Sequence, residues 1–167
     1  AVHRLDKETS GCLLFAKTTE AKEVAIPMFK ERSIIKVYRA VTVGQFPKTW
    51  KEIHTDVAGF MSTTLVKTLD SNKRSSYLEL RIETGRTHQI RVHMLSIGHP
   101  LVGDPTYGTK PKKSSEEIRK LITDFPRQAL HAKYLELIHP DTGQKVMWES
   151  ELPEDFDELL LTLRKAS

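Results

Sequence analysis

The sequence has little cysteine and no long apolar run. Cys12 is the only cysteine among 167 residues, so no disulfide can form within the chain and no zinc site can be built from cysteines. A reducing, cytoplasmic compartment is expected. No stretch approaches the roughly 20 apolar residues that span a bilayer, which excludes a membrane-spanning helix. The sequence also lacks a Gly-x-Ser-x-Gly elbow and a glycine-rich phosphate loop, which argues against a serine hydrolase and a P-loop NTPase.

The charge of the chain is unevenly distributed along its length. Hydrophobic residues make up 38% and charged residues 29% of the chain, the mean hydropathy is −0.41 and the pI is near 9.1, as in soluble globular domains. Residues 1–113 carry 19 basic and 11 acidic side chains, whereas residues 114–167 carry 7 and 11. The excess of Lys and Arg in the first two thirds favours a polyanionic partner.

The pattern of apolar residues predicts several strands and a few helices. Strands are expected at residues 12–15, 34–44, 63–69, 77–83, 129–138 and 145–149. Helices are expected at residues 19–32, from Thr87 to Ile97, after a cap at Ser114, and from Pro153 onward. Pro27 should kink the first helix or delay its start, and Asp141-Thr142-Gly143 should form a hairpin turn. Grouped strands with few helices predict an α+β fold, with a mixed, largely antiparallel sheet flanked by helices.

Acidic, basic and hydroxyl side chains are concentrated at the start of the chain. The segment His3-Arg4-Leu5-Asp6-Lys7-Glu8-Thr9-Ser10-Gly11 directly precedes the first predicted strand. Polar residues at the end of a core strand can be held rigidly, as a catalytic loop requires. The Asp6 carboxylate could act as a nucleophile, as a general base, or only as the cap of a turn.

A second polar cluster, Gly85-Arg86-Thr87-His88-Gln89-Ile90-Arg91-Val92-His93, opens the helix predicted from Thr87. Residues three and four apart share a helix face, so Arg91 should lie beside Thr87 and His88, at a helix start that favours phosphate or carboxylate groups. A solvated basic face is the alternative. His88 and His93 are five residues apart, which is not the spacing of two metal ligands on one helix, so no metal site is expected.

Three segments follow one another in the chain: HRLDKETSG at 3–11, KVYRA at 36–40 and GRTHQIRVHMLSIGHPLVGDPTYG at 85–108. Together they resemble the motifs of the RluA-type RNA pseudouridine synthases, in particular the branch that acts on large-subunit ribosomal RNA. RQALHA at 127–132, His139-Pro140 and the closing PEDF segment are similar to the C-terminal part of that family. The resemblance implies the pseudouridine synthase catalytic fold.

The resemblance also implies an enzyme that converts uridine in RNA to pseudouridine, by breaking the glycosidic bond and rejoining the uracil through carbon, with no metal or organic cofactor. Asp6 matches the catalytic aspartate, Tyr38 the tyrosine that stacks on the target base, and Arg91 the basic residue that pairs with the aspartate. Arg4 matches an arginine that fills the space left by the flipped base. The other substrate-binding residues that the resemblance implies are His3, Leu13, Arg86, Thr87, His88, Gln89 and Ile90.

The resemblance covers nearly the whole chain and implies one catalytic domain, residues 1–167. Family members carry strands before the His-Arg-Leu-Asp motif, and many carry an S4-type RNA-binding domain. Neither is seen in this sequence, so we expect an N-terminally incomplete domain with an exposed sheet edge and weak or no activity alone. Structured RNA is the expected partner, with large-subunit ribosomal RNA as the substrate and transfer RNA as the alternative. No membrane partner is expected, and the oligomeric state is left open.

Two other functions compete with this one. A catalytically silent RNA-binding module of the same fold would keep the basic surface without the chemistry. A metal-dependent phosphodiesterase would use the histidines, although their spacing disfavours it.

Overall fold

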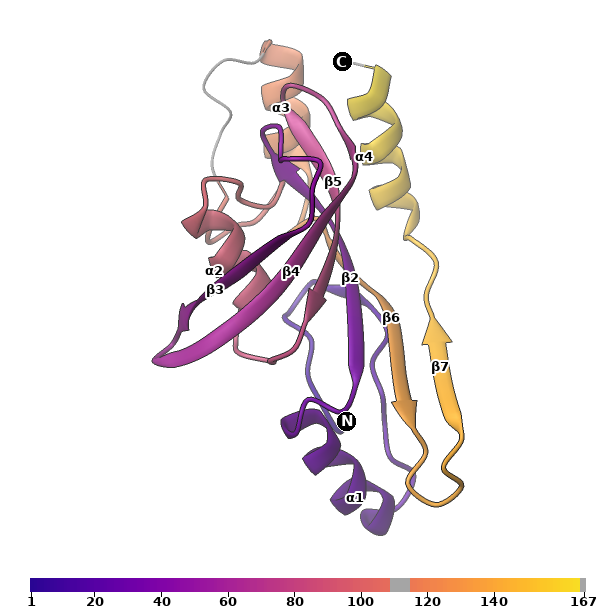
Figure 1. Cartoon of the computed structure of the whole chain (residues 1–167). Coiled ribbons are helices and arrows are strands. Elements are labelled where there is room, and N and C mark those ends of the chain that lie inside the picture. Colours follow the sequence, from indigo (N-terminus) through magenta and orange to yellow (C-terminus); the bar gives the residue numbers. More distant parts are fainter. Residues whose placement is uncertain (109–114, 166–167) are drawn as a thin grey trace.

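One mixed sheet organises the chain (Figure 1). The computed structural model describes residues 1–108 and 115–165. In these residues the sheet has seven strands, in the order β1-β6-β2-β5-β4-β3, with β7 also paired to β6. The strands are β1 (Ser10–Gly11), β2 (Ile35–Val43), β3 (Lys51–Val57), β4 (Phe60–Ser71), β5 (Ser75–Ile82), β6 (Leu130–Ile138) and β7 (Lys145–Glu149). β1 is parallel to β6 and the other pairs are antiparallel, which confirms the predicted fold class.

Helices cover both faces of the sheet (Figure 1). They are α1 (Thr19–Lys30), α2 (Gln89–Ser96), α3 (Glu116–Asp124) and α4 (Glu154–Lys165). On one face, Ile90 and Met94 of α2 join Leu78 in the main core. On the opposite face, Phe156 of α4 packs against Tyr77, with ring centroids 6.3 Å apart. Because alternate residues of a strand point to opposite faces, the alternating residues of β5 pack in both cores.

A smaller core lies between α1, the segment after β1 and the β6–β7 end of the sheet. α1 begins at Thr19, and the Thr18 hydroxyl caps it by accepting the Ala21 N–H at 3.1 Å. Pro27 lies inside this helix. It does not delay the helix start, because the capped first turn lies upstream of the bond that proline cannot make.

The strand predicted at residues 12–15 is wrong in position. Pairing with β6 is confined to Ser10 and Gly11, followed by one hydrogen bond from the Cys12 N–H to the Ala132 carbonyl at 2.9 Å. Gly11 has φ +116, and a Cβ there would lie 2.2 Å from the Ala132 oxygen, so only glycine fits. Beyond Cys12 the chain leaves the sheet; Leu14 packs in the core beside α1, whereas Leu13 and Phe15 are exposed.

The structure has the other predicted strands, the last helix and the hairpin turn where the sequence places them. It also has β3, which was not predicted. Only Ile53 and Val57 of the seven β3 residues are buried, so the strand carries no apolar signal. The predicted turn at Asp141-Thr142-Gly143 joins β6 to β7, with Gly143 at φ 68. The predicted cap Ser114 lies outside the described residues.

The start of α2 also differs from the prediction. The helix begins at Gln89, and the capping residue is His88 in the left-handed conformation (φ 55), not Thr87. No side chain caps the first N–H groups of α2; instead the Gln89 side chain holds the preceding segment, because its Oε1 accepts the Arg86 N–H at 3.2 Å and the Thr84 hydroxyl at 2.5 Å. The segment before α2 is therefore held by a residue inside the helix.

Candidate active site

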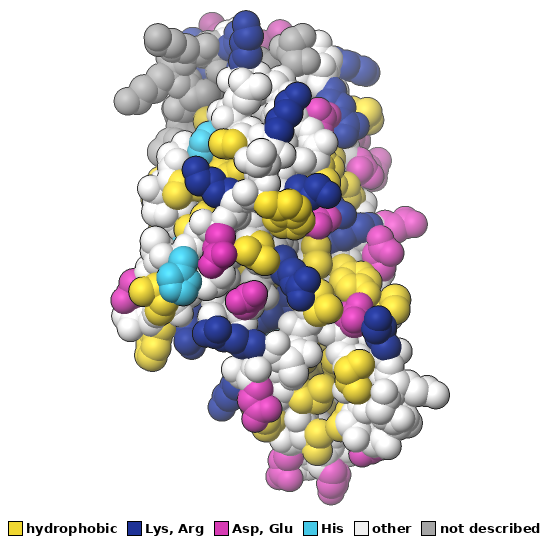
Figure 2. Space-filling model, viewed as in Figure 1, with side chains coloured by type: hydrophobic (Ala, Val, Ile, Leu, Met, Phe, Trp, Pro, Cys, Tyr) yellow, Lys and Arg dark blue, Asp and Glu magenta, His cyan; other side chains and the backbone are white. Residues whose placement is uncertain are grey.

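A basic cleft of about 500 Å³ opens on the α2 face of the sheet. Its walls come from the first nine residues, α1, the start of β2 and the segment between β5 and α2. Two carboxylates, Asp6 and Glu83, line it, against the cations Arg4, Lys30, Arg32, Lys36 and Arg86. The outline in Figure 2 is indented between the lobe that carries α1 and the body of the sheet, and Lys and Arg side chains border the indentation. Such a cleft suits a small, negatively charged ligand.

Asp6 and Tyr38 lie together in this cleft. The Asp6 side chain is 15% exposed, and Tyr38 on β2 is 9% exposed. Burial, with the charge of Asp6 as a second cause, raises the pKa of the Tyr38 hydroxyl well above its usual range, so the phenol stays neutral. A neutral phenol beside a carboxylate offers a flat face for stacking and a hydroxyl that can donate.

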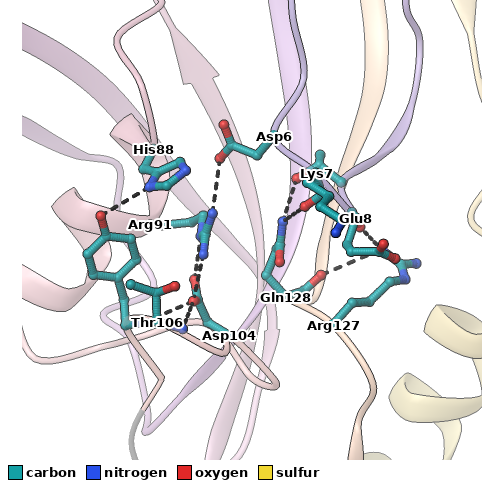
Figure 3. Close-up of polar contacts among 11 residues, drawn as sticks. Asp6, Lys7, Glu8, His88, Arg91, Asp104, Thr106, Arg127 and Gln128 are labelled. Carbon is teal, nitrogen blue, oxygen red and sulfur yellow. Dashed lines mark hydrogen bonds and ion pairs between the residues drawn. The ribbon is translucent and has the colours of Figure 1, made fainter.

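Arg91 links Asp6 to a second aspartate, Asp104 (Figure 3). Arg91 is buried on α2, and its Nη1 lies 3.5 Å from Oδ2 of Asp6. Its Nε and Nη2 donate to the two oxygens of Asp104 at 2.6 and 2.9 Å. The structure thus brings Arg91 to Asp6, as the motifs predict, but adds a shorter bidentate pair. The sequence presents Asp104 only as part of a loop, and its place inside the third motif was the one available signal.

Asp104 is held ionised behind Arg91. Its carboxylate also accepts the backbone N–H groups of Thr106 and Tyr107, at 2.9 and 3.0 Å. Burial alone would raise the pKa of Asp104, but the hydrogen bonds from Arg91 and these two N–H groups outweigh it and lower the pKa. The turn is tight because a Cβ at Gly108 would lie 2.3 Å from the Asp104 carbonyl oxygen. Arg91 therefore meets a fixed negative charge on its inner side.

Tyr107 joins Arg91 to His88. The Arg91 guanidinium carbon lies 5.1 Å from the centre of the Tyr107 ring, a cation–π contact. The Tyr107 hydroxyl and His88 Nδ1 are hydrogen-bonded at 3.0 Å. The third motif thus folds back on itself, and His88, which also lines the cleft, is oriented by Tyr107.

The loop that carries Asp6 is anchored by Arg127 and Gln128, which the sequence analysis did not single out (Figure 3). Gln128 Nε2 donates to the Lys7 carbonyl at 2.7 Å and to the Thr9 hydroxyl at 3.0 Å. Arg127 Nη1 donates to the Glu8 carbonyl at 3.1 Å. These bonds hold the backbone directly after Asp6, so the RQALHA segment positions the N-terminal motif.

The structure places most of the predicted substrate-binding residues around this cleft. His3, Arg4, Arg86, Thr87, His88, Gln89 and Ile90 line it, together with Asp6 and Tyr38. Leu13 does not line it and is 39% exposed elsewhere, because the chain has left the sheet by that point. Arg86 is exposed and stacks over the Phe60 ring at 4.7 Å. Gln89 is buried and also donates to the Thr63 carbonyl and the Thr64 hydroxyl, so its side chain supports the loop.

His3 is a neutral part of the cleft wall. Its ring stacks on Phe29, with centroids 4.4 Å apart and planes 8° from parallel. Its Nε2 accepts the Leu14 N–H at 2.9 Å. Burial, followed by the charges of Lys36 and the N-terminus, lowers the pKa of His3 to about 4. At neutral pH it is therefore an uncharged acceptor that ties the first motif to the segment after β1.

Neither a metal-binding cluster nor a membrane-spanning helix is found in the described residues. Within 1–108 and 115–165, no three His, Cys, Asp or Glu side chains are grouped so that they could hold a metal ion. In the same part of the chain no helix is long and apolar enough to cross a bilayer.

Comparison with known proteins gives consistent matches. A family model described as RNA pseudouridylate synthase matches residues 1–96. The ribosomal large subunit pseudouridine synthase D of Pseudomonas aeruginosa is 40% identical over an alignment 180 residues long, which covers 98% of this chain and 56% of that protein. The protein of the same name from Nitrosomonas europaea is 44% identical over an alignment 177 residues long, which covers 98% of this chain and 51% of that protein. This chain thus spans about half the length of the curated relatives it matches.

Two solved structures share the fold. Human RNA Pseudouridylate Synthase Domain Containing 4 has a TM-score of 0.79 and 27% identity, over 98% of this chain and 75% of that chain. Human RNA Pseudouridylate Synthase Domain Containing 1 has a TM-score of 0.70 and 28% identity, over 98% and 79%.

Proposed function

This chain belongs to the RNA pseudouridylate synthase family, and we propose that it converts specific uridines of structured RNA to pseudouridine. We propose large-subunit ribosomal RNA as the substrate, because that RNA appears in the names of relatives at 40 and 44% identity. The reaction belongs in the cytoplasm, in keeping with the single cysteine. The observation that carries the proposal is the Asp6 carboxylate, held 3.5 Å from Arg91 in a basic cleft beside Tyr38.

Asp6 is the catalytic carboxylate of this proposal. Isomerisation breaks the bond between the sugar and a uracil nitrogen and forms a bond between the sugar and a uracil carbon. No atom is gained or lost overall, and no electrons are exchanged with a cofactor. The group needed is one that can act as nucleophile or base at the scissile bond. Asp6 lines the cleft and keeps 15% of its side chain exposed, so it can reach a bound nucleotide.

Arg91 orients Asp6, while its main counter-charge is Asp104. The guanidinium is paired with Asp104 through two short hydrogen bonds, and the 3.5 Å contact to Asp6 uses its remaining Nη1. A carboxylate directed by one longer contact keeps its other oxygen free for the substrate. Fixing the direction of attack in this way is a major source of rate acceleration.

Tyr38 binds the flipped base, and Arg4 fills the position that the base leaves in the RNA. A uridine must leave its stack to enter a cleft, which costs a few kcal/mol, and stacking on the neutral ring of Tyr38 offsets part of that cost. Arg4 is exposed at the cleft, and its planar guanidinium can fill the vacated position in the RNA.

The proposal is tested by incubating this chain, and a version extended at its N-terminus, with transcribed large-subunit ribosomal RNA and with a tRNA pool. Pseudouridine in the ribosomal RNA is the expected product. Modification of tRNA alone would replace the substrate class. Binding without modification of either RNA by both proteins would favour the catalytically silent module.

A further inference from the structure

Lys36 is a buried cation in the wall of the cleft. It is 7% exposed and lies on β2, two residues before Tyr38. Residues two apart on a strand point to the same face and lie about 7 Å from each other. Both side chains line the cleft, so Lys36 flanks the place where the target base would stack.

Among the described residues Lys36 forms no hydrogen bond and no ion pair. The two carboxylates of the cleft, Asp6 and Glu83, make no ion pair with it; the Asp6 carboxylate is directed at Arg91. The ammonium lies against the backbone at Gly85, where a Cβ would stand 3.3 Å from Nζ. Nζ is not among the fully buried polar atoms, so the ammonium at the end of this largely buried side chain is open to the cleft. A largely buried charge without a partner is costly, and native proteins rarely keep one without a reason. Burial also lowers the pKa of Lys36, which is the direction expected for an ammonium without a counter-charge.

The surroundings of Lys36 favour an anionic oxygen as the missing partner. Arg4, Arg32 and Arg86 line the same cleft, so the local field attracts negative charge. Gly85 has no side chain, and a Cβ there would crowd Nζ at 3.3 Å. An ammonium is a compact point charge that suits phosphate oxygens.

We propose that Lys36 binds a phosphate oxygen of the RNA strand, at the nucleotide whose base stacks on Tyr38. This inference rests on the proposed function, since it takes RNA as the ligand of the cleft. It makes Lys36 the residue that pulls the backbone of the flipped nucleotide toward the cleft. A phosphate oxygen at Nζ would offset the cost of a largely buried ammonium.

The test compares Lys36→Met with Lys22→Met in equilibrium binding of transcribed large-subunit ribosomal RNA over a series of salt concentrations. Lys22 is exposed on α1 and does not line the cleft, so its variant removes the same charge elsewhere. Lys36→Met should bind at least about 10-fold more weakly, as expected for a lost hydrogen bond to a charged group. Its slope of log affinity against log salt should be smaller by about 0.7 to 0.9, the value of one phosphate contact. Lys22→Met should match the parent in both.

A stability measurement separates this role from a structural one. Removing an unpartnered buried ammonium should leave the free energy of unfolding equal to or above that of the parent. Lys36→Arg, which keeps the charge, should keep the parent salt slope. Unchanged affinity in Lys36→Met would overturn the phosphate assignment. A lower affinity with an unchanged salt slope would also overturn it, because it would indicate contact with a neutral oxygen of the nucleotide. Loss of stability with unchanged slope would make Lys36 structural.

The outcomes also separate this inference from the function on which it rests. If the parent binds and modifies RNA while Lys36→Met behaves like Lys22→Met, only the inference fails. If the parent does not bind RNA, the proposed function fails and the inference fails with it.

Discussion

The Arg91 guanidinium donates two hydrogen bonds to Asp104, at 2.6 and 2.9 Å, and makes one longer contact of 3.5 Å with Asp6. Asp104 is also bound by two backbone N–H groups, whereas Asp6 faces the cleft. The two carboxylates therefore have different roles: Asp104 fixes the position of Arg91, and Arg91 orients Asp6. This arrangement makes Asp104 a positioning residue of the proposed reaction.

The first prediction concerns Asp104→Asn. Removing the nearer partner of a buried ion pair leaves Arg91 with only its longer contact to Asp6, so the free energy of unfolding should fall by about 3 kcal/mol. Pseudouridine formation should fall as well. The control is Asp70→Asn, because Asp70 pairs with Arg164 at the surface, with side chains 50 and 52% exposed. That change should cost less than about 1 kcal/mol in urea unfolding, and equal losses in the two variants would contradict the account.

The second prediction concerns Gln128→Ala. Without this side chain the Lys7 carbonyl and the Thr9 hydroxyl lose their bonds, and the Asp6 loop loosens. A misplacement of about 1 Å can cost about 100-fold in rate, so the single-turnover rate should fall much more than RNA affinity. Gln144→Ala, in the β6–β7 turn, should leave both unchanged. A loss of affinity with an unchanged rate would show that Gln128 does not position Asp6.

The third prediction concerns the loop around Asp104. Gly103 has φ +73, and a Cβ there would lie 2.2 Å from the Arg127 carbonyl oxygen. Gly143 has a similar φ, +68, but a Cβ there would meet nothing within 4 Å. Gly143→Ala should cost only the conformational strain, about 1 kcal/mol, whereas Gly103→Ala should add a steric clash and cost about 3 kcal/mol or more. Thermal unfolding of the two variants measures the difference, and equal midpoints would be evidence against the packed loop.

The fourth prediction concerns pH and His3. The pKa of His3 is about 4 in the folded chain against 6.5 for the free side chain, so between these values the unfolded chain binds more protons. Stability should therefore be fully present above pH 6.5 and decrease as the pH falls toward 4. The loss is at most about 3 kcal/mol, and smaller in practice because His3 is partly exposed.

His3→Gln isolates this effect, because glutamine keeps an acceptor for the Leu14 N–H but does not titrate. The pKa values of His93 and His131 are also lowered by burial, but they contribute to parent and variant alike. The free energy of unfolding of the variant should thus depend less on pH in this window. Parallel pH profiles would mean that His3 is solvated like a free histidine.

Much of the fold follows from local patterns. The apolar alternation of β2 and β5 is visible in the sequence because their burial is periodic, and α4 is marked by the acidic residues of its first turn. β3 is not visible, because it is half of an exposed hairpin whose pairing with β4 carries no apolar signal. The first strand is misplaced because the apolar run from Cys12 to Phe15 is not buried in the sheet: Cys12 and Leu14 pack in the small core beside α1, and Leu13 and Phe15 are exposed.

The candidate site was predictable only where a motif marks it. Asp6, Tyr38 and Arg91 follow from the resemblance, and the structure brings them to one place. Asp104 and Gln128 contribute through contacts with residues 13 and 121 positions away, which no local pattern encodes. Lys36 stands inside a recognised motif, but its burial without a partner is visible only in three dimensions.

The central claim, that Asp6 carries the chemistry, is tested most directly by the pseudouridine content of large-subunit ribosomal RNA after incubation with the active parent protein and with its Asp6→Asn variant. The account predicts less than about 1% of the parent turnover in the variant, with RNA affinity within about threefold, since Asp6 is one carboxylate in a basic cleft. Turnover by Asp6→Asn close to that of the parent would contradict it and would assign the chemistry to another residue.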